Sequence, residues 1–430
     1  MRRFNPYFAA NIFIMQRFIQ QWIKISLISL ATVALLGCIL RYKIAFSLPF
    51  VDQKYLLHAH SHFAFSGWIT QALMTCLIGY LAKSSLPNIE KKYKILLIAN
   101  LVTACGMLFS FPWEGYGVVS IIFSTLSIFV SYFFAVTYWR DLNRLPQKSI
   151  AHRWFKFAVL FNAVSSIGAF SLAFMMATKI MHPELYSAAI YFFLHFQYNG
   201  WFFFACMGLF TTYLSTQNIN LKYMPLVLKL FAAAIVPAYI LSILWIEPSL
   251  WLYIIIVLSA IAQLAAFLLM IFILKPFLKK IIPHAPRIAV WLTGFAAISL
   301  FIKLLLQLLS VIPSLNQMVY GFRPIVIGYL HLVFLGIITL YILSYCILHN
   351  YIIVSKTAIK AIYLFTAGII INEVLLMLQG IFDLFYINIP FMSEMLLAAA
   401  VIMFAGITFT VISQFKRIEY LNTSQKLFTY

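Results

Sequence analysis

The sequence predicts an all-α, polytopic membrane protein with twelve transmembrane helices. Three observations lead to this fold class. Of the 430 residues, 64% are hydrophobic and only 9% are charged, whereas about a quarter of a soluble domain is charged. The mean hydropathy is +0.98. The apolar residues also fall into long runs, each with the ~20 residues that a helix needs to cross a bilayer.

Twelve such runs follow one another, and each can satisfy its own backbone hydrogen bonds as a helix in lipid. A basic, mixed segment over 1–21 precedes them and is expected to lie at the cytoplasmic membrane surface. A cytoplasmic tail over 416–430 follows the transmembrane domain, 22–415. The twelve expected spans are approximately 22–46, 55–82, 93–112, 117–139, 154–180, 186–215, 223–245, 249–275, 287–312, 323–348, 356–379 and 389–415.

The positions of lysine and arginine predict the orientation, because cytoplasmic segments carry an excess of both. With both termini cytoplasmic, most of these residues fall in inner segments. The outer segments then hold only Arg41, Lys43, Lys54, Lys179 and Arg323. The net charge of +20 is therefore mainly an orientation signal and predicts no nucleic-acid partner. The expected partner is the lipid bilayer, and the expected location is the inner (plasma) membrane of a bacterium.

Several classes of site and protein are disfavoured. The cysteines are scattered singly, so they predict neither a disulfide framework nor a thiolate metal site. No segment between spans is long enough for a soluble domain. No internal repeat or phosphate-binding glycine loop stands out, which disfavours an ATP-driven pump. The five cysteines are Cys38, Cys76, Cys105, Cys206 and Cys346.

Histidines within apolar runs are the main functional signal. His58, His60 and His62 stand near the outer start of the second run, in LLHAHSHFAFSGW. An imidazole in such a run is costly unless it has a partner. His58 and His62 are four residues apart and share a helix face, whereas His60 is rotated by ~200°. We expect His60 to make packing or hydrogen-bonding contacts elsewhere.

Two further spans carry a histidine at a similar depth. His62, His195 and His331 lie ~10, ~14 and ~12 Å from the outer starts of spans 2, 6 and 10, at ~1.5 Å per residue. A shared layer of imidazoles is what a buried metal ion or heme requires. A lone intramembrane histidine can instead bond to a neighbouring helix. Both alternatives stay open for His195, whereas ligation is favoured for His62 and His331.

This layout resembles the catalytic subunit (subunit I) of the heme-copper oxidases, in particular the branch that contains the nitric oxide reductases. The likeness covers the twelve-span topology and three short motifs. HAHSHFAFSGW is similar to that branch's span 2, FLHFQYNGWFFFACMGLFTTYL to its span 6 and YLHLVFLG to its span 10. A family of twelve-span nitric-oxide-response proteins has a similar histidine layout and stays an alternative.

The resemblance implies a low-spin heme b held by His331 and by His62, or by His58 one turn away. Two imidazole ligands make a heme an electron carrier, because no position is left for a substrate. His195 would correspond to a ligand of a second, non-heme metal, copper or iron. Arg323, at the outer start of span 10, is placed to meet a heme propionate or to act as a plain interfacial anchor.

The sequence departs from this family at two ligand positions. Tyr329 stands where the family has the histidine of its high-spin heme, and tyrosine can also ligate heme. The expected span 223–245 has no histidine, although the family completes its non-heme metal site there. A second metal would therefore lack most of its ligands, which disfavours standard dioxygen reduction. His182-Pro183-Glu184 mimics a family metal motif, but the pattern is typical of a helix start.

Other polar residues in the spans are also candidates for a function. Lys303 and Glu373 are expected to pair, because a single buried charge is costly in a membrane. The pair would serve either the structure or a proton path. Gln197 and Asn199 flank a tyrosine in span 6 and predict a polar lining near His195.

Two classes of function follow. The first is a membrane heme-binding redox protein, either an electron carrier or a reductase of nitric oxide or dioxygen. Its electron donor would be a separate subunit, a cytochrome or a quinol. The second is a non-enzymatic membrane protein that handles or senses heme or copper, or a transporter, in which the HxHxH stretch captures the metal. The missing ligands weigh against catalytic turnover, and His331 weighs against a metal site in span 2 alone.

Overall fold

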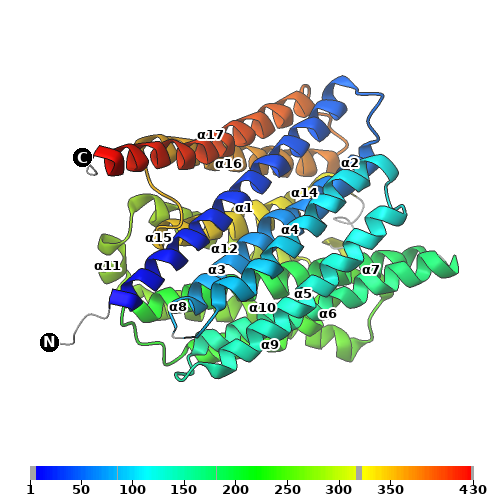
Figure 1. Ribbon diagram of the computed structural model, residues 1–430. Helices are drawn as coiled ribbons and strands as arrows, with labels where there is room; N and C mark the ends of the chain where they lie inside the picture. Colours follow the sequence, from blue (N-terminus) through cyan, green and yellow to red (C-terminus); the bar gives the residue numbers. More distant parts are fainter. Residues whose placement is uncertain (1–5, 85, 181, 316–321, 428–430) are drawn as a thin grey trace. The chain divides into compact units, whose positions relative to one another are not determined.

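The computed structural model describes residues 6–427, apart from 85, 181 and 316–321 (Figure 1). In this part of the chain the regular structure is all helical, without a β-strand. Eleven of its helices are long and apolar enough to cross a membrane. The chain is therefore a multi-pass helical membrane protein, as the composition predicts. The count of twelve spans and the cytoplasmic location of both ends stay predictions.

The observed helices begin and end within a few residues of most expected runs. Helix α1 is longer and runs unbroken over Pro6–Phe46, so that 6–21 and the first expected span form one helix. The expected run 186–215 is the helical stretch Pro183–Thr216, which is not among the eleven candidate spans. Its polar residues Gln197 and Asn199 lower its hydropathy.

The chain divides into two compact units, and the first unit contains the N-terminal helices and the last three. It includes the residues up to Val130, Ile342–Phe382 and the residues from Ile387 onward. Its elements are α1 (Pro6–Phe46), α2 (Gln53–Phe63), the π-helical segment η1 (Ala64–Thr70), α3 (Gln71–Leu81), α4 (Ile89–Glu114), the first half of α5 (Val118–Arg144), most of α15 (Leu340–Leu348), α16 (Lys356–Leu384) and α17 (Met392–Leu427).

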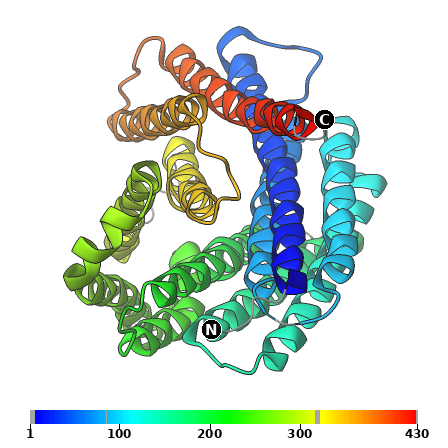
Figure 2. The same ribbon diagram turned by 60° about the vertical axis from the view of Figure 1, so that its left-hand side comes forward.

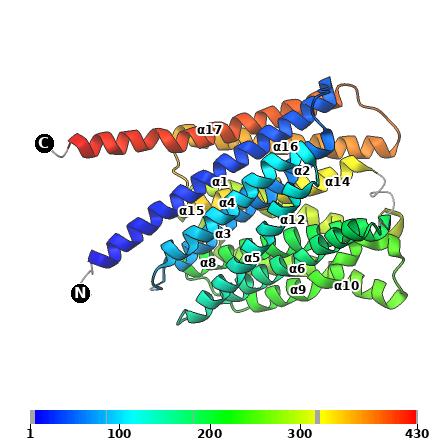
Figure 3. The ribbon, with the colours of Figure 1, turned by 45° about the vertical axis from the view of Figure 1, so that its right-hand side comes forward.

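Helices from the two ends of the sequence pack together in the first unit. Helix α1 lies along α17, and the beginning of α1 is at the same end of the unit as the end of α17 (Figures 1 and 3). Helix α16 lies beside α17 (Figure 2). Their backbones approach closely because Gly368 faces Met403 and Gly406 faces Phe365, as small residues allow between membrane helices.

The second unit contains the middle of the chain, Ser131–Tyr341 with Asp383–Tyr386. Helix α6 lies along α7 and α8, and α9 pairs with α10 (Figure 3). Its elements are the second half of α5, α6 (Ile150–Thr178), α7 (Pro183–His195), the π-helical segment η2 (Phe196–Phe202), α8 (Phe203–Thr216), α9 (Met224–Ala238), the 3₁₀ segment η3 (Tyr239–Ile246), α10 (Leu250–Leu274), the short segments η4 (Lys275–Phe277), α11 (Leu278–Ile281) and η5 (Ile282–His284), α12 (Arg287–Leu309), α14 (Arg323–His331) and the π-helical segment η6 (Leu332–Thr339).

Both units expose large apolar side chains along their helices. Phe109 and Trp113 of α4, and Trp251 and Phe272 of α10, are mostly exposed. Such surfaces are unfavourable in water, whereas lipid tails solvate them well. The buried polar residues described below are therefore enclosed by helices whose outer faces suit a bilayer.

The His182-Pro183-Glu184 motif starts a helix, as its sequence predicts. Pro183 is in the first turn of α7, where its missing N–H has no effect on the helix. Glu184 is also in the first turn, where the helix dipole favours an acidic side chain.

Candidate functional site

His62, His195 and His331 each lie within two residues of the start of a π-helical segment in their own helix. His195 and His331 are the last α-helical residues before η2 and η6, and His62 stands two residues before η1. A π-helical turn is wider than an α-helical one, is rare, and is frequent at functional sites. The three histidines therefore share one local structure in three separate helices.

The sequence around these histidines repeats as well. His62, His195 and His331 begin the stretches HFAFSGW, HFQYNGW and HLVFLGI, and they are spaced nearly evenly along the chain. An aromatic residue follows each histidine by three positions and a glycine follows by five. These stretches share a short local pattern, and the absence of an internal repeat of the chain stays a prediction. So few positions recur that only alignment on the histidines, with the π-helices known, reveals them.

Two of the repeated glycines let the π-helical segment touch the preceding helix. A Cβ atom added to Gly200 would lie 2.5 Å from Phe161 of α6, and one added to Gly336 would lie 2.8 Å from Ser299 of α12. Side chains do not tolerate such distances without movement. The glycines thus allow η2 to pack on α6 and η6 on α12. This packing fixes the position of the histidine that precedes each π-helical segment.

His58 and His62 lie against the end of α4 in the first unit. The His62 ring stacks on Phe111, with ring centroids 4.4 Å apart, and its Nε2 atom is 3.1 Å from the Tyr116 hydroxyl. The His58 ring contacts the Tyr116 ring edge-on, with centroids 4.6 Å apart. These contacts confirm that the two histidines share a helix face.

His60 points to a different neighbour, whereas His58 has an unsatisfied nitrogen. The His60 Nδ1 atom is 3.1 Å from the backbone carbonyl of Val33 in α1, so the three histidines do not converge. The His58 Nε2 atom is buried and has no hydrogen-bond partner among the described residues. An unsatisfied buried nitrogen is unusual in a folded protein, and a bound ligand could supply the missing partner.

His195 is a hydrogen-bonded core residue of the second unit, with 2% of its surface exposed. Its Nε2 atom donates to the Ile235 carbonyl at 2.8 Å, so the neutral ring has its lone pair on Nδ1. The Asn199 side-chain amide donates to that Nδ1 atom at 3.2 Å. The Ile235 carbonyl can accept this bond because α9 ends nearby. The N–H of Tyr239, which would bond to this carbonyl in a continuing α-helix, donates to the carbonyls of Val236 and Pro237 instead. The structure therefore shows the hydrogen-bonded alternative for His195.

The two amides near His195 face different ways. Asn199 contacts His195, as the expected polar lining requires. Gln197 instead reaches α6, where its Nε2 atom donates to Asn162 at 3.0 Å and to Ser165 at 2.7 Å. The wider π-helical turn thus presents one amide to the histidine and the other to the neighbouring helix.

The His331 ring is held by a hydrogen bond within its own helix. Its Nδ1 atom is 2.8 Å from the Ile327 carbonyl. A carbonyl only accepts, so Nδ1 carries the hydrogen and the neutral ring has its lone pair on Nε2. Metal-binding histidines are commonly fixed by such a bond. Arg323, at the start of the same helix, is exposed.

Tyr329 belongs to a pair of tyrosines. Its ring is 6.3 Å from that of Tyr198, measured between centroids, in an edge-on contact. The Tyr198 hydroxyl lies within reach of Tyr329, Asn199 and Ser242. The Tyr329 phenol is thus linked to the polar residues beside His195.

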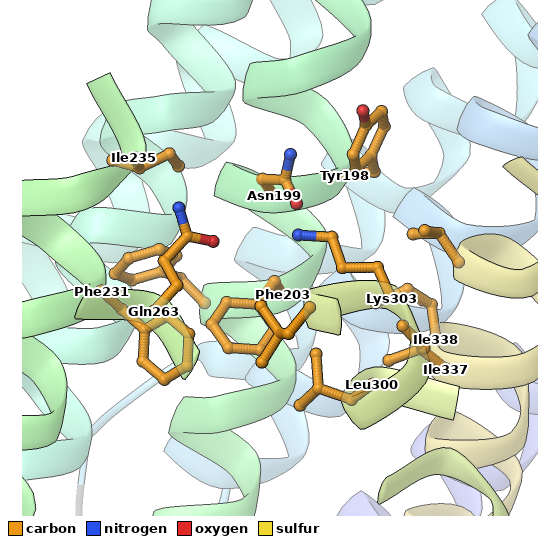
Figure 4. Close-up of a pocket in the computed structure, with 13 residues that line it drawn as sticks. Tyr198, Asn199, Phe203, Phe231, Ile235, Gln263, Leu300, Lys303, Ile337 and Ile338 are labelled. Atoms are coloured by element: carbon orange, nitrogen blue, oxygen red, sulfur yellow. The ribbon is translucent and has the colours of Figure 1, made fainter. Parts of the chain in front are cut away.

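A small cavity extends this polar group toward Lys303. It has a volume of about 20 Å³, which is enough for one water molecule. In Figure 4 the side-chain oxygens of Asn199 and Gln263 face the Lys303 amine. None of the lining residues carries a carboxylate: they are Tyr198, Asn199, Phe203, Phe204, Phe231, Ile235, Gln263, Leu300, Lys303, Leu304, Val333, Ile337 and Ile338.

The Lys303 amine is bonded to an amide on its own helix. With 3% of its surface exposed, Lys303 donates from Nζ to the Gln307 Oε1 atom at 2.5 Å. Glu373 lies in the first unit and accepts from Asn372 at 3.2 Å. Each charged group thus has a neutral partner within its own unit, and a Lys303–Glu373 pair stays a prediction.

The residues around His195 do not fit a second metal ion. Both ring nitrogens are engaged, by Ile235 and by Asn199. Among the described residues, no group of three or more His, Cys, Asp and Glu side chains is arranged to hold a metal ion. Metal ions such as zinc need about that many protein ligands. A heme differs, because two axial histidines are sufficient.

No protein-family model matches the chain, and a comparison with curated proteins found no match. The resemblance to the oxidases therefore depends on the short motifs around His62, His195 and His331 and on the helical topology.

Proposed function

We propose that this protein is a membrane heme-binding redox protein, with an inner-membrane heme b held between two histidines. His331 is one ligand. His58 is the other, because its Nε2 atom is buried without a partner, whereas the Tyr116 hydroxyl engages Nε2 of His62. Bound in this way, the heme would accept single electrons from a donor protein or a quinol and pass them to an acceptor.

The observation that carries the proposal is the hydrogen bond from His331 Nδ1 to the Ile327 carbonyl. With the hydrogen on Nδ1, Nε2 is the nitrogen that would coordinate the heme iron, and the bond fixes the ring. His58 and His331 belong to different units, and their joint ligation is part of the proposal. Tyr116 and Phe111 would pack around the span 2 histidines, keep water out and hold the imidazole planes.

Electron transfer is favoured over reduction of a small gas. A heme with two histidine ligands has no open position for nitric oxide or dioxygen. Turnover would need a second metal, and the surroundings of His195 do not fit one. The non-enzymatic alternative, capture of a metal by His58, His60 and His62 together, is disfavoured because His60 is bonded to Val33.

An absorption spectrum of the purified protein tests the proposal. After expression with ample heme, the reduced protein should show the spectrum of a low-spin heme b. His331→Ala should abolish it, and so should His58→Ala. His60→Ala is the matched control in the same helix and should leave the spectrum unchanged. A protein without heme and iron, or a spectrum that survives His331→Ala, would refute the proposal. If the low-spin spectrum is lost in His62→Ala but kept in His58→Ala, His62 and not His58 is the second heme ligand.

A further inference from the structure

Two cysteines far apart in the sequence meet in the first unit. Cys76 of α3 and Cys346 of α15 are 270 positions apart, yet their Sγ atoms lie 3.8 Å from each other. Both side chains are buried, with 0% and 1% of their surface exposed. All five cysteines are free thiols. Spacing along the chain gave no sign of this thiol pair.

A buried phenol accompanies the two sulfurs. Tyr351 follows α15, and its backbone N–H donates to the Cys346 carbonyl at 2.8 Å. Its hydroxyl lies over Gly79, one turn beyond Cys76, where a Cβ atom would be 2.5 Å away. A phenol O–H group is a hydrogen-bond donor, so Tyr351 can donate to a thiolate in this cluster.

The geometry points to a binding site for one soft monovalent metal ion, Cu(I), between Cys76 and Cys346. Two metal–sulfur bonds of ~2.3 Å span at most ~4.6 Å, so sulfurs 3.8 Å apart can hold an ion after a small movement. Soft thiolates select Cu(I) among the common metals. Two ligands are enough for Cu(I), whereas zinc needs about four.

Binding of Cu(I) at this site would release protons and leave an anionic complex. Cu⁺ and two thiols give a bis-thiolate complex of net charge −1 and two released protons, without any redox step. The Lys83 Nζ atom, 3.3 Å from His349 Nδ1, offers a positive charge at the same end of the unit. The His349 ring lies 5.8 Å from that of Tyr351, between centroids. A proton donor and a nearby cation thus both favour the anionic complex.

Two adjacent thiols could instead be oxidised to a disulfide. A disulfide requires sulfurs ~2.05 Å apart, so Cys76 and Cys346 would have to approach each other by about 1.7 Å. Binding of Cu(I) needs a smaller movement, in the opposite direction. Both outcomes use the same residues, and the experiment must therefore separate them.

Competition for Cu(I) tests the site in the full-length protein. The purified, reduced protein is titrated with Cu(I) held by bicinchoninate, and bound copper is measured after gel filtration. We expect one tightly bound Cu(I), with affinity at least tenfold lower in Cys76→Ser and in Cys346→Ser. Cys206→Ser, a buried cysteine in the second unit, is the matched control and should bind as the wild type does. His58→Ala should also leave this affinity unchanged.

X-ray absorption of the copper-loaded wild type gives a second measurement that needs no variant. It should show copper bound by two sulfur atoms. Nitrogen ligands instead, or an affinity that Cys76→Ser and Cys346→Ser leave unchanged, would refute the site. Absence of Cu(I) uptake by the reduced protein, together with a Cys76–Cys346 disulfide after exposure to hydrogen peroxide, would make the pair a thiol–disulfide couple.

Discussion

The Nε2 atom of His195 donates a hydrogen bond to the carbonyl oxygen of Ile235, 2.8 Å away. This bond joins the end of α7 to the end of α9, where the helix changes to a 3₁₀ segment. A histidine that the sequence offers as a metal ligand thus stabilises a break in a neighbouring helix. Removal of the His195 ring should therefore lower the free energy of unfolding.

His195→Phe should lower the stability of the protein by about 1–3 kcal/mol, because it keeps the ring volume but leaves the Ile235 carbonyl and the Asn199 amide without a buried partner. The apparent melting temperature of the detergent-purified protein measures this. His182→Phe, at an exposed position, is the control and should change little. An unchanged melting temperature in His195→Phe would show that these hydrogen bonds do not stabilise the fold.

Lys303 and Gln307 should respond unequally to substitution. Gln307→Leu removes the bonded partner of a buried amine and should cost about 1–3 kcal/mol. Lys303→Met keeps a similar volume and removes the buried amine, but leaves the neutral Gln307 amide without this bond, so its loss should be smaller than that of Gln307→Leu. Thermal unfolding of both single variants and of the double variant measures their coupling. Equal losses in the two single variants would contradict this account.

Two glycines in the second unit should give opposite results when changed to alanine. Gly200→Ala introduces a Cβ atom 2.5 Å from Phe161 and should destabilise the protein by about 1–3 kcal/mol. Gly294, inside α12, has no atom within 4 Å of an added Cβ. Gly294→Ala should stabilise that helix by up to ~1 kcal/mol. Melting temperatures that move in the same direction would show that the contact of η2 with α6 is looser than described.

Stability should fall in mild acid through His349. Burial, followed by the Lys83 ammonium, lowers the pKa of His349 from 6.5 to about 3. Between these values the unfolded chain binds a proton that the folded chain excludes. The stabilisation is therefore complete above pH 6.5 and is lost progressively as the pH falls toward 3.

Melting temperatures of the wild type and of His349→Gln, measured from pH 7 down to pH 4, check this. The wild type should lose more stability than His349→Gln as the pH falls, since the glutamine has no proton to gain. His284→Gln, at an exposed histidine, is the matched control and should follow the wild-type curve. Parallel curves for the wild type and His349→Gln would contradict the prediction.

Hydropathy alone predicts the helices because each span must be apolar over its whole length. The expected run 323–348 coincides with the observed candidate span Arg323–Leu348. The face shared by His58 and His62 followed from helix geometry, as did the separate direction of His60. These features depend on local rules, and a single sequence contains enough information for them.

Contacts between distant helices were not accessible in the same way. The partners of His62, which are Phe111 and Tyr116, follow it by some fifty positions, and Cys76 meets Cys346 across most of the chain. Nothing in hydropathy or spacing specifies which helices become neighbours. The π-helical segments were missed for another reason, since their hydrophobic pattern differs little from that of an α-helix.

The π-helical segments after His62, His195 and His331 also set the angular phase of each span. An α-helix turns by ~100° per residue, and a π-helical turn absorbs one extra residue. Deleting a single residue within η1, η2 or η6 would restore a regular α-helix. It would also rotate the histidine by about 100° relative to the remainder of its span. Single-residue deletions, rather than substitutions, are thus the changes that would redirect each imidazole while keeping the composition of its helix.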